Sequence, residues 1–265
     1  MQQDYVDIIA GHQRQLKKTL IQVVMVLLIV AACGYYVGLF DAERLGDGVP
    51  SIIGLMAESI PPNFSEAQSW FSPLLDTLAM SIAGTALAVL FSIPLGILAA
   101  RNTSPHPAVY QAARGVLNAL RAIPELIMGI LFVAAVGFGA LPGVLALGFH
   151  SIGMVGKFIS ESIEHADEQP VEAIRAAGAT PFQEITHGIL PQVMPQIADV
   201  TIYRWEYNFR ASTVMGMVGA GGIGFELMSS LRLMRYDEVS AILLVILIMV
   251  TLVDGIGTLL RKRFK

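Results

Sequence analysis

A run of polar side chains interrupts an apolar part of the chain, in the stretch TIYRWEYNFR from Thr201 to Arg210. The fork of an arginine side chain matches phosphate-like oxyanions, so such a run can contact an anion. Glu206 and Arg210 are four residues apart and can instead pair on one helix face, as can Arg204 and Asn208. The run therefore supports two hypotheses. Its side chains line a path for an oxyanion, or they form internal pairs that fix helices or a subunit interface.

A glycine-rich stretch follows this run and satisfies the pattern GxGxxG through Gly219, Gly221 and Gly224. A dinucleotide site built on this pattern needs a preceding strand and a soluble βαβ unit, but an apolar segment precedes it here. Glycine also permits tight turns and close helix packing. We therefore expect Gly219, Gly221, Gly222 and Gly224 to form a turn or a packing contact, and they are candidates for an outer gate.

Other chemistries lack the residues that they need. The P-loop pattern GxxxxGK[ST] is absent, because Gly156-Lys157 is followed by Phe158 and Ser151 stands where the first glycine is required. ATP hydrolysis by a P-loop is therefore excluded for this chain. No catalytic triad, paired acidic site or metal-ligating constellation stands out, so we expect neither an enzyme nor a metal site.

The composition points to a membrane protein. Hydrophobic residues make up 54% of the 265 residues, charged residues only 14%, and the mean hydropathy is +0.63. A soluble domain has about 25% charged residues. No basic footprint for nucleic acid is visible. The stretch ending at Cys33 resembles a lipid-attachment signal, but the apolar run continues to Phe40, which favours a retained membrane helix.

Six segments are apolar over about 20 residues, the length that crosses a bilayer as a helix. They are approximately Leu20–Phe40, Leu74–Ala99, Ile123–Pro142, Val144–Glu164, Ile197–Val218 and Val239–Leu260. The pattern predicts an all-α membrane protein with about six transmembrane helices. The first outer loop, Asp41–Pro73, is acidic and includes an apolar patch at Ser51–Ile60 that is too short to span.

The positive charges predict the orientation, because cytoplasmic flanks carry an excess of Lys and Arg. With the N-terminus inside, ten basic residues lie on inner flanks and three on outer flanks. The inner ones are Arg14, Lys17, Lys18, Arg101, Arg114, Arg175, Arg261, Lys262, Arg263 and Lys265; the outer ones are Arg44, Arg232 and Arg235. Both termini are therefore expected in the cytoplasm. The expected parts are a cytoplasmic tail (1–19), a first helix with its outer loop (20–73), a core of the remaining spans (74–260) and a basic tail (261–265).

A partly polar insert, EAIRAAGATPFQEITHGILPQ, lies between the fourth and fifth predicted spans, on the cytoplasmic side. Residues 172–177 favour a helix that Gly178 can close in a left-handed conformation. Thr180, Pro181 and Gln183 form a capping-box pattern for a second short helix, which we expect to stop near Pro191. A helix pair this short is marginal alone in water and needs a partner surface.

The insert resembles the cytoplasmic EAA loop of ABC-importer permeases, through Glu172-Ala173, Gly178 six residues after the glutamate, and Leu190-Pro191. It departs from the pattern at Ile174 and Gly188. Residues 120–126, around Pro124, resemble the start of the third span in such permeases. Residues 209–213 together with the glycine-rich stretch 218–224 resemble the phosphonate or phosphite uptake subgroup. The resemblance covers roughly residues 74–260. It implies that the coupling loop, residues 172–191, contacts an ATPase through Glu172, Ala173, Ala176, Gly178, Leu190 and Pro191.

The resemblance implies a type I ABC importer permease fold, MetI-like, in the bacterial cytoplasmic (inner) membrane. The expected partners are two ATP-binding subunits, a second permease copy in a homodimer, an extracytoplasmic substrate-binding protein and the lipid bilayer, but no nucleic acid. The chain itself binds no cofactor, and ATP is used by the partner subunits. The expected substrate is phosphonate, phosphite or a similar phosphorus oxyanion. Two alternatives stay open: a permease for another small solute such as methionine, and an ion-coupled secondary transporter.

Overall fold

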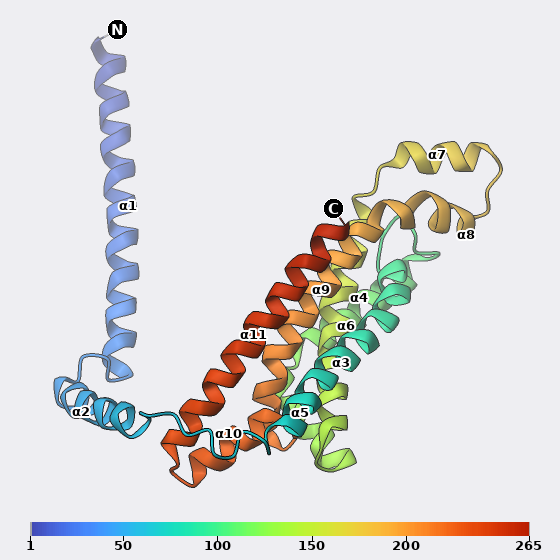
Figure 1. Ribbon diagram of the computed structural model, residues 1–265. Helices are drawn as coiled ribbons and strands as arrows, with labels where there is room; N and C mark the ends of the chain where they lie inside the picture. Colours follow the sequence, from blue (N-terminus) through green and yellow to red (C-terminus); the bar gives the residue numbers. More distant parts are fainter. Residues whose placement is uncertain (1, 265) are drawn as a thin grey trace. The chain divides into compact units, whose positions relative to one another are not determined.

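The computed structural model describes residues 2–264, so Met1 of the predicted N-terminal tail and Lys265 of the predicted basic tail lie outside the described residues. The chain divides into two compact units, with the boundary between Glu58 and Ser59. Within residues 2–264 all regular structure is helical (Figure 1).

The first unit contains two helices, α1 (Gln2–Tyr36) and α2 (Ala42–Glu58). Within α1, Arg14–Tyr36 is long and apolar enough to cross a membrane, as the sequence predicts. Most of the apolar patch predicted at Ser51–Ile60 lies in α2, which is a regular helix of 17 residues. The segment predicted to be an outer loop thus begins with a helix.

The second unit contains the remaining elements. They are α3 (Phe71–Leu98), α4 (Pro107–Ala122), α5 (Glu125–Val136), α6 (Ala140–Glu164), α7 (Glu168–Ala176), α8 (Pro181–Gln183), the π-helical segment η1 (Glu184–Ile189), α9 (Leu190–Met215), the 3-10 turn η2 (Gly216–Val218), α10 (Ile223–Arg232) and α11 (Tyr236–Phe264). The helices α3, α6 and α9 pack against one another, and α11 packs against α9 and α10. Figure 1 shows α7 and α8 at one end of this bundle and α10 at the other.

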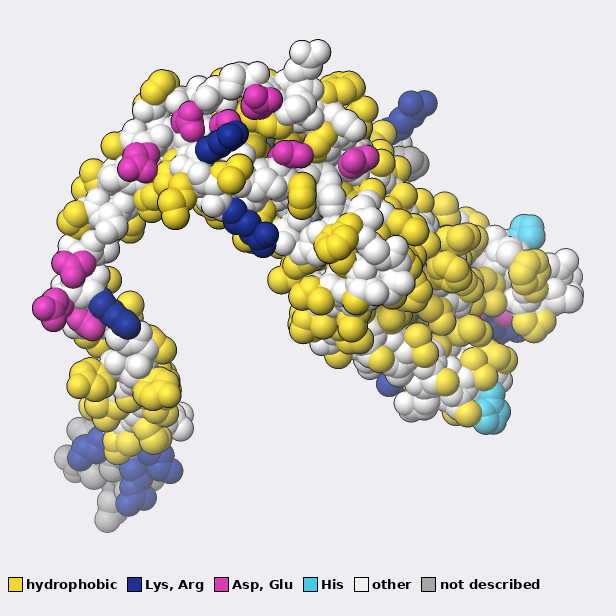
Figure 2. Space-filling model, turned by 90° about the horizontal axis from the view of Figure 1, so that it is seen from below, with side chains coloured by type: hydrophobic (Ala, Val, Ile, Leu, Met, Phe, Trp, Pro, Cys, Tyr) yellow, Lys and Arg dark blue, Asp and Glu magenta, His cyan; other side chains and the backbone are white. Residues whose placement is uncertain are grey.

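Small residues let the bundle helices approach closely, as in other membrane helix pairs. A Cβ on Gly84 would lie 3.1 Å from Leu147 Cβ, and one on Gly96 would lie 2.6 Å from Ile159 Cγ2, so α3 and α6 meet at these glycines. The outer surface is apolar: large hydrophobic side chains such as Leu90, Leu247 and Ile248 are exposed. Yellow hydrophobic side chains are abundant on the face shown in Figure 2, as expected for helices that contact lipid.

Four of the six predicted spans are found as helices long and apolar enough to span by themselves. The third and the fifth lie in two bent helix pairs, which bring the number to six if each pair is one span. The third predicted span, Ile123–Pro142, is wrong as a single helix, because α5 ends at Val136 and α6 begins at Ala140. α5 has only 12 residues, about 18 Å in length, and α4 meets it at a bend of 88°. The break falls at Pro124, which lacks an N–H and disfavours a helical residue before it.

The turn between the third and fourth predicted spans lies earlier than expected. Gly137 and Gly139 have φ of +87° and +124°, which end α5 and let α6 start at Ala140. Pro142 therefore lies in the first turn of α6, where a missing N–H costs no hydrogen bond.

Candidate functional site

The insert forms the helix, turn and helix that the sequence predicts. α7 begins at Glu168, because Asp167 caps it by accepting a hydrogen bond from Gln169 N at 3.0 Å, so it starts before the predicted Glu172. Gly178 has φ of +86°, which confirms the left-handed turn after α7. The capping box is confirmed as well: Thr180 and Gln183 each accept a hydrogen bond from the backbone N–H of the other.

The second helix does not stop near Pro191, as the sequence predicts. It continues through η1 into α9, and Pro191 lies in the first turn of α9. The π-helical turn explains this difference, since Leu190 N bonds to Ile185 O and the register shifts just before the proline. The insert is thus continuous with the fifth span, and a displacement of η1 acts directly on α9.

Two sets of side-chain contacts hold α7 against this second helix. Arg175 donates to both carboxylate oxygens of Glu184, from Nε at 3.1 Å and from Nη2 at 2.9 Å. Gln192 accepts from Asp167 N at 2.9 Å and donates from Nε2 to Asp167 O at 3.1 Å and to Gly188 O at 2.7 Å. The hydrogen bond with Glu184 and its negative charge raise the pKa of Arg175 above its usual value.

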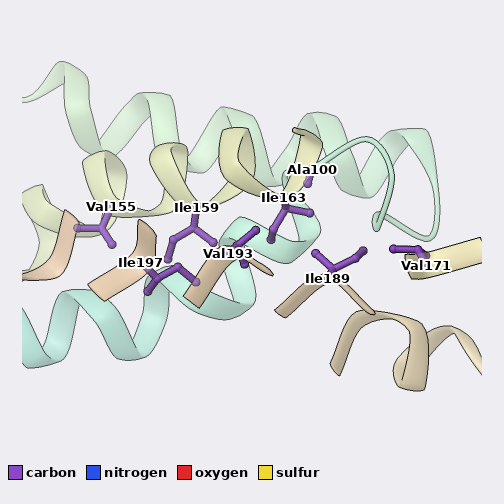
Figure 3. Packing of buried hydrophobic residues seen from close by; sticks show 8 residues of the cluster. All are labelled: Ala100, Val155, Ile159, Ile163, Val171, Ile189, Val193 and Ile197. Atoms are coloured by element: carbon purple, nitrogen blue, oxygen red, sulfur yellow. The ribbon is translucent and has the colours of Figure 1, made fainter. Parts of the chain in front are cut away.

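A hydrophobic cluster joins the insert to the transmembrane helices. Val171 of α7 and Ile189 of η1 belong to the same buried cluster as Ile159 and Ile163 of α6 and Val193 of α9 (Figure 3). Buried apolar contacts of this kind resist displacement of one element relative to another. α7 is therefore packed against the transmembrane helices through this cluster.

Most of the residues that resemble the EAA pattern lie on the exposed surface of the insert. Glu172, Ala173, Ala176, Gly178 and Pro191 are exposed, and Leu190 is half-buried. Phe182 adds an aromatic ring that is 74% exposed. Between α7 and the segment from Pro181 to Ile189 lies a cavity of about 260 Å³, whose polar lining includes Glu172 and Glu184. An exposed helix with small residues and a hollow beside it suits contact with another protein.

Two of the four polar candidates in α9 belong to a buried chain of hydrogen bonds. Arg204 Nε donates to Ser151 Oγ at 2.7 Å, Ser151 Oγ donates to Asn208 Oδ1 at 3.1 Å, and Asn208 Nδ2 donates to Thr85 Oγ1 at 2.9 Å. The predicted Arg204–Asn208 pair is thus bridged by Ser151. Arg204 also lies over the ring of Tyr207, 4.2 Å from its centre. These contacts join α3, α6 and α9.

The predicted pair between Glu206 and Arg210 is wrong. Glu206 Oε1 accepts from Arg261 Nη2 at 2.7 Å, and Arg210 Nη1 donates to Asp254 at 2.8 and 3.1 Å. Both α9 residues therefore pair with α11 rather than with each other. Gly257 permits this arrangement, because a Cβ at that position would overlap the Glu206 carboxylate.

The two ion pairs differ in exposure. The Glu206 side chain is 6% exposed and that of Arg261 25%, whereas Arg210 and Asp254 are 43% and 45% exposed. The first pair is enclosed between α9 and α11, and the second opens onto a surface of the unit.

The glycine-rich stretch forms both a turn and a packing contact. Gly219, Gly221 and Gly222 have φ of +96°, +74° and +72°, which residues with a Cβ rarely adopt. Gly224 packs so tightly that a Cβ would overlap the Thr213 carbonyl. Ile223 N donates to Thr77 Oγ1 at 2.9 Å and so ties the start of α10 to α3. The role of these glycines in an outer gate stays a prediction.

The partners of these groups were not predicted from the sequence. Asp254, the single acid in the sixth predicted span, could have been identified as a candidate partner, since a charge in an apolar run requires an opposite charge or water beside it. Arg261 was counted only as part of a basic tail, and Gln192 and Ser151 carry no signal in the sequence. Within residues 2–264, no group of three or more His, Cys, Asp or Glu side chains is placed to hold a metal ion.

Comparison with known proteins gives consistent results. Residues 92–265 match the family described as binding-protein-dependent transport system inner membrane component. The chain is 69% identical to the phosphite transport system permease protein PtxC of Stutzerimonas stutzeri, over 92% of this chain and 89% of that protein. It is 43% identical to the phosphate-import permease protein PhnE of Mycolicibacterium smegmatis, over 84% of this chain but only 42% of that protein.

The fold is also known from solved structures. A chain of the MetNI methionine ABC transporter, in an inward-facing conformation, matches with a TM-score of 0.66 at 21% identity, over 76% of this chain and 99% of that one. At this identity the match concerns the fold alone, and it confirms the predicted MetI-like fold. By its family match, the chain is a transport component rather than an enzyme. It belongs to the family of binding-protein-dependent transport system inner membrane components.

Proposed function

We propose that this chain is the permease subunit of an ATP-driven ABC importer that carries phosphite or a closely related phosphorus oxyanion. The observation that carries the proposal is the 69% identity to a phosphite permease over 92% of the chain. The relative that imports phosphate, at 43% identity, supports the wider class of phosphorus oxyanions. Phosphonate belongs to the same class and is an outcome that the experiment below can distinguish.

ATP enters this mechanism through partner subunits, and the chain binds no cofactor of its own. Two ATPase subunits dock on the exposed faces of two coupling loops, one from each permease copy. We place these loops, and both chain termini, on the cytoplasmic side, in agreement with the excess of basic residues there. A substrate-binding protein delivers the anion on the opposite side.

Motion passes from α7 to the pathway through the contacts of the insert. Arg175–Glu184 and Gln192–Asp167 hold α7 on the segment that continues into α9. A push on α7 therefore displaces α9, which carries Arg204, Asn208 and Arg210. ATP binding favours one orientation of the permease pair only if the ATPases contact that orientation better than the other.

A second permease copy is supported by an exposed ion pair within the membrane. Arg210 and Asp254 lie in apolar helices, yet more than two fifths of each side chain is exposed in the single chain. Charged groups at membrane depth face protein or water rather than lipid, because their transfer to hydrocarbon costs at least about 2.5–3.5 kcal/mol each. The surface that carries this pair therefore faces a partner copy or a water-filled path between two copies.

Reconstitution tests the proposal. The permease, the ATPase and the binding protein of the same system are placed in liposomes, and uptake of labelled phosphite, phosphonate, phosphate and methionine is measured with and without ATP. ATP-dependent uptake of phosphite above the other solutes is the expected result. Uptake of methionine alone would overturn the substrate class, and uptake by the permease alone under a proton or sodium gradient would show a secondary transporter instead.

A further inference from the structure

We propose that Arg210 and Asp254 form an exchangeable anion site, in which a phosphorus oxyanion takes the place of the Asp254 carboxylate on the Arg210 guanidinium during passage. This inference rests on the proposed function, because it assigns a contact to the anion that the importer carries. The Asp254 carboxylate competes with the anion for the Arg210 guanidinium. Arg210 provides the hydrogen bonds that hold the anion.

The contact geometry leaves Arg210 able to bind a second group. A single nitrogen, Nη1, donates to both oxygens of Asp254, at 2.8 and 3.1 Å. Among the residues that the structure describes, Nε and Nη2 of Arg210 have no hydrogen-bond partner. An oxyanion can be bound through two parallel N–H donors of a guanidinium, which adds both strength and orientation. The free edge of Arg210 thus offers the geometry that an oxyanion needs.

The surface around Arg210 is open along α9. Tyr203 and Val214 lie seven and four residues from Arg210, which places all three on one face of α9, and Tyr203 and Val214 are 53% and 44% exposed. On the same two helices, the Glu206–Arg261 pair is enclosed, with Glu206 only 6% exposed. Of the two arginines in the α9 run, Arg210 is therefore the one that is exposed in the single chain, whereas Arg204 is buried.

The Asp254 carboxylate allows the anion to leave Arg210. An arginine without a counter-charge in the path would hold an anion more strongly, and its release would be slower. Conduction requires that a site bind well enough to admit an ion and weakly enough to let it leave. Asp254 returns to Arg210 as the anion departs, so the guanidinium is never left without a negative partner. A solute without negative charge gains nothing from this exchange.

Direct binding tests the site. The permease–ATPase complex is placed in lipid nanodiscs without the binding protein, and labelled phosphite is titrated against wild-type protein and four variants. Asp254→Asn removes the competitor, and we expect binding to become tighter by up to about fivefold, the upper range for an exposed ion pair. Arg210→Gln is expected to abolish saturable binding. Arg210→Lys keeps the charge but loses the fork, so binding weakens while the ion pair survives.

Thr258→Val is the matched control. Thr258 lies one turn from Asp254 on the same helix and donates only to the Asp254 backbone carbonyl, at 2.9 Å. This variant is expected to bind phosphite like the wild type. The melting temperature and copurification of the ATPase are measured for every variant. Arg210→Lys decides the question if Arg210→Gln does not fold.

The outcomes distinguish a failure of the exchange site from a failure of the proposed function. If wild-type liposomes import phosphite but bind none in nanodiscs, or if all three site variants bind it like Thr258→Val, the exchange site is overturned and the importer stands. Tighter binding to Asp254→Asn together with weaker binding to Arg210→Lys supports the site. If the complete system imports no phosphorus oxyanion, the proposed function fails and this inference fails with it.

Discussion

The enclosed ion pair between α9 and α11 should contribute measurably to stability. Glu206→Ala removes the partner of Arg261, whose Nη2 lies 2.7 Å from Glu206 Oε1. Removing one member of a buried pair costs about 3–5 kcal/mol, because the other charge is left unpaired. A quarter of the Arg261 side chain is exposed and can be partly solvated, so we expect the low end, about 3 kcal/mol.

A double-mutant cycle isolates the interaction. The free energy of unfolding is measured in mixed micelles for Glu206→Ala, Arg261→Ala and the double variant. We expect the double variant to be more stable than the sum of the single effects predicts, by well over the ~0.5 kcal/mol within which independent sites add. The Arg210–Asp254 pair, measured in the same way, should couple by at most about 1 kcal/mol, as exposed pairs do. Additive effects at Glu206 and Arg261 would refute the pairing and its role in joining the helices.

Three further predictions concern the coupling loop and the glycine turn. Gln192→Ala removes both hydrogen bonds to Asp167, each worth about 1 kcal/mol net, and should lower phosphite imported per ATP hydrolysed by at least about fivefold. Gln196→Ala, an exposed position one turn on, should leave this ratio unchanged. Glu172→Lys should leave the purified permease as stable as wild type but reduce ATPase copurification; equal copurification contradicts the docking role. Gly224→Ala should destabilise the protein by about 1–3 kcal/mol through overlap with the Thr213 carbonyl, and an unchanged melting temperature would count against the packing at α10.

Features that depend on a few neighbouring residues were predicted correctly from the sequence. The capping box at Thr180 and the left-handed Gly178 depend on neighbours within a few residues, so the sequence is sufficient to predict them. The apolar runs likewise predict four of the membrane helices, because hydrocarbon thickness sets their length. Proline is a residue type that interrupts helices, so a break at Pro124 is a local property, but the 88° bend depends on how α4 and α5 pack and could not be read locally.

The residue pattern was sufficient to predict a helical membrane protein with a helix–turn–helix insert and polar groups in its fifth span. Which of these groups pair depends on how the helices pack. Glu206 pairs with Arg261 and Arg210 pairs with Asp254, and each partner lies on α11, more than 40 residues away in sequence. Glu206 and Arg210 do not pair with each other, although their spacing of four residues would allow it. The physical reason is that a charge within the membrane pairs with whichever opposite charge the packing brings within reach, and Gly257 lets α9 and α11 approach closely enough for that partner to lie on the neighbouring helix.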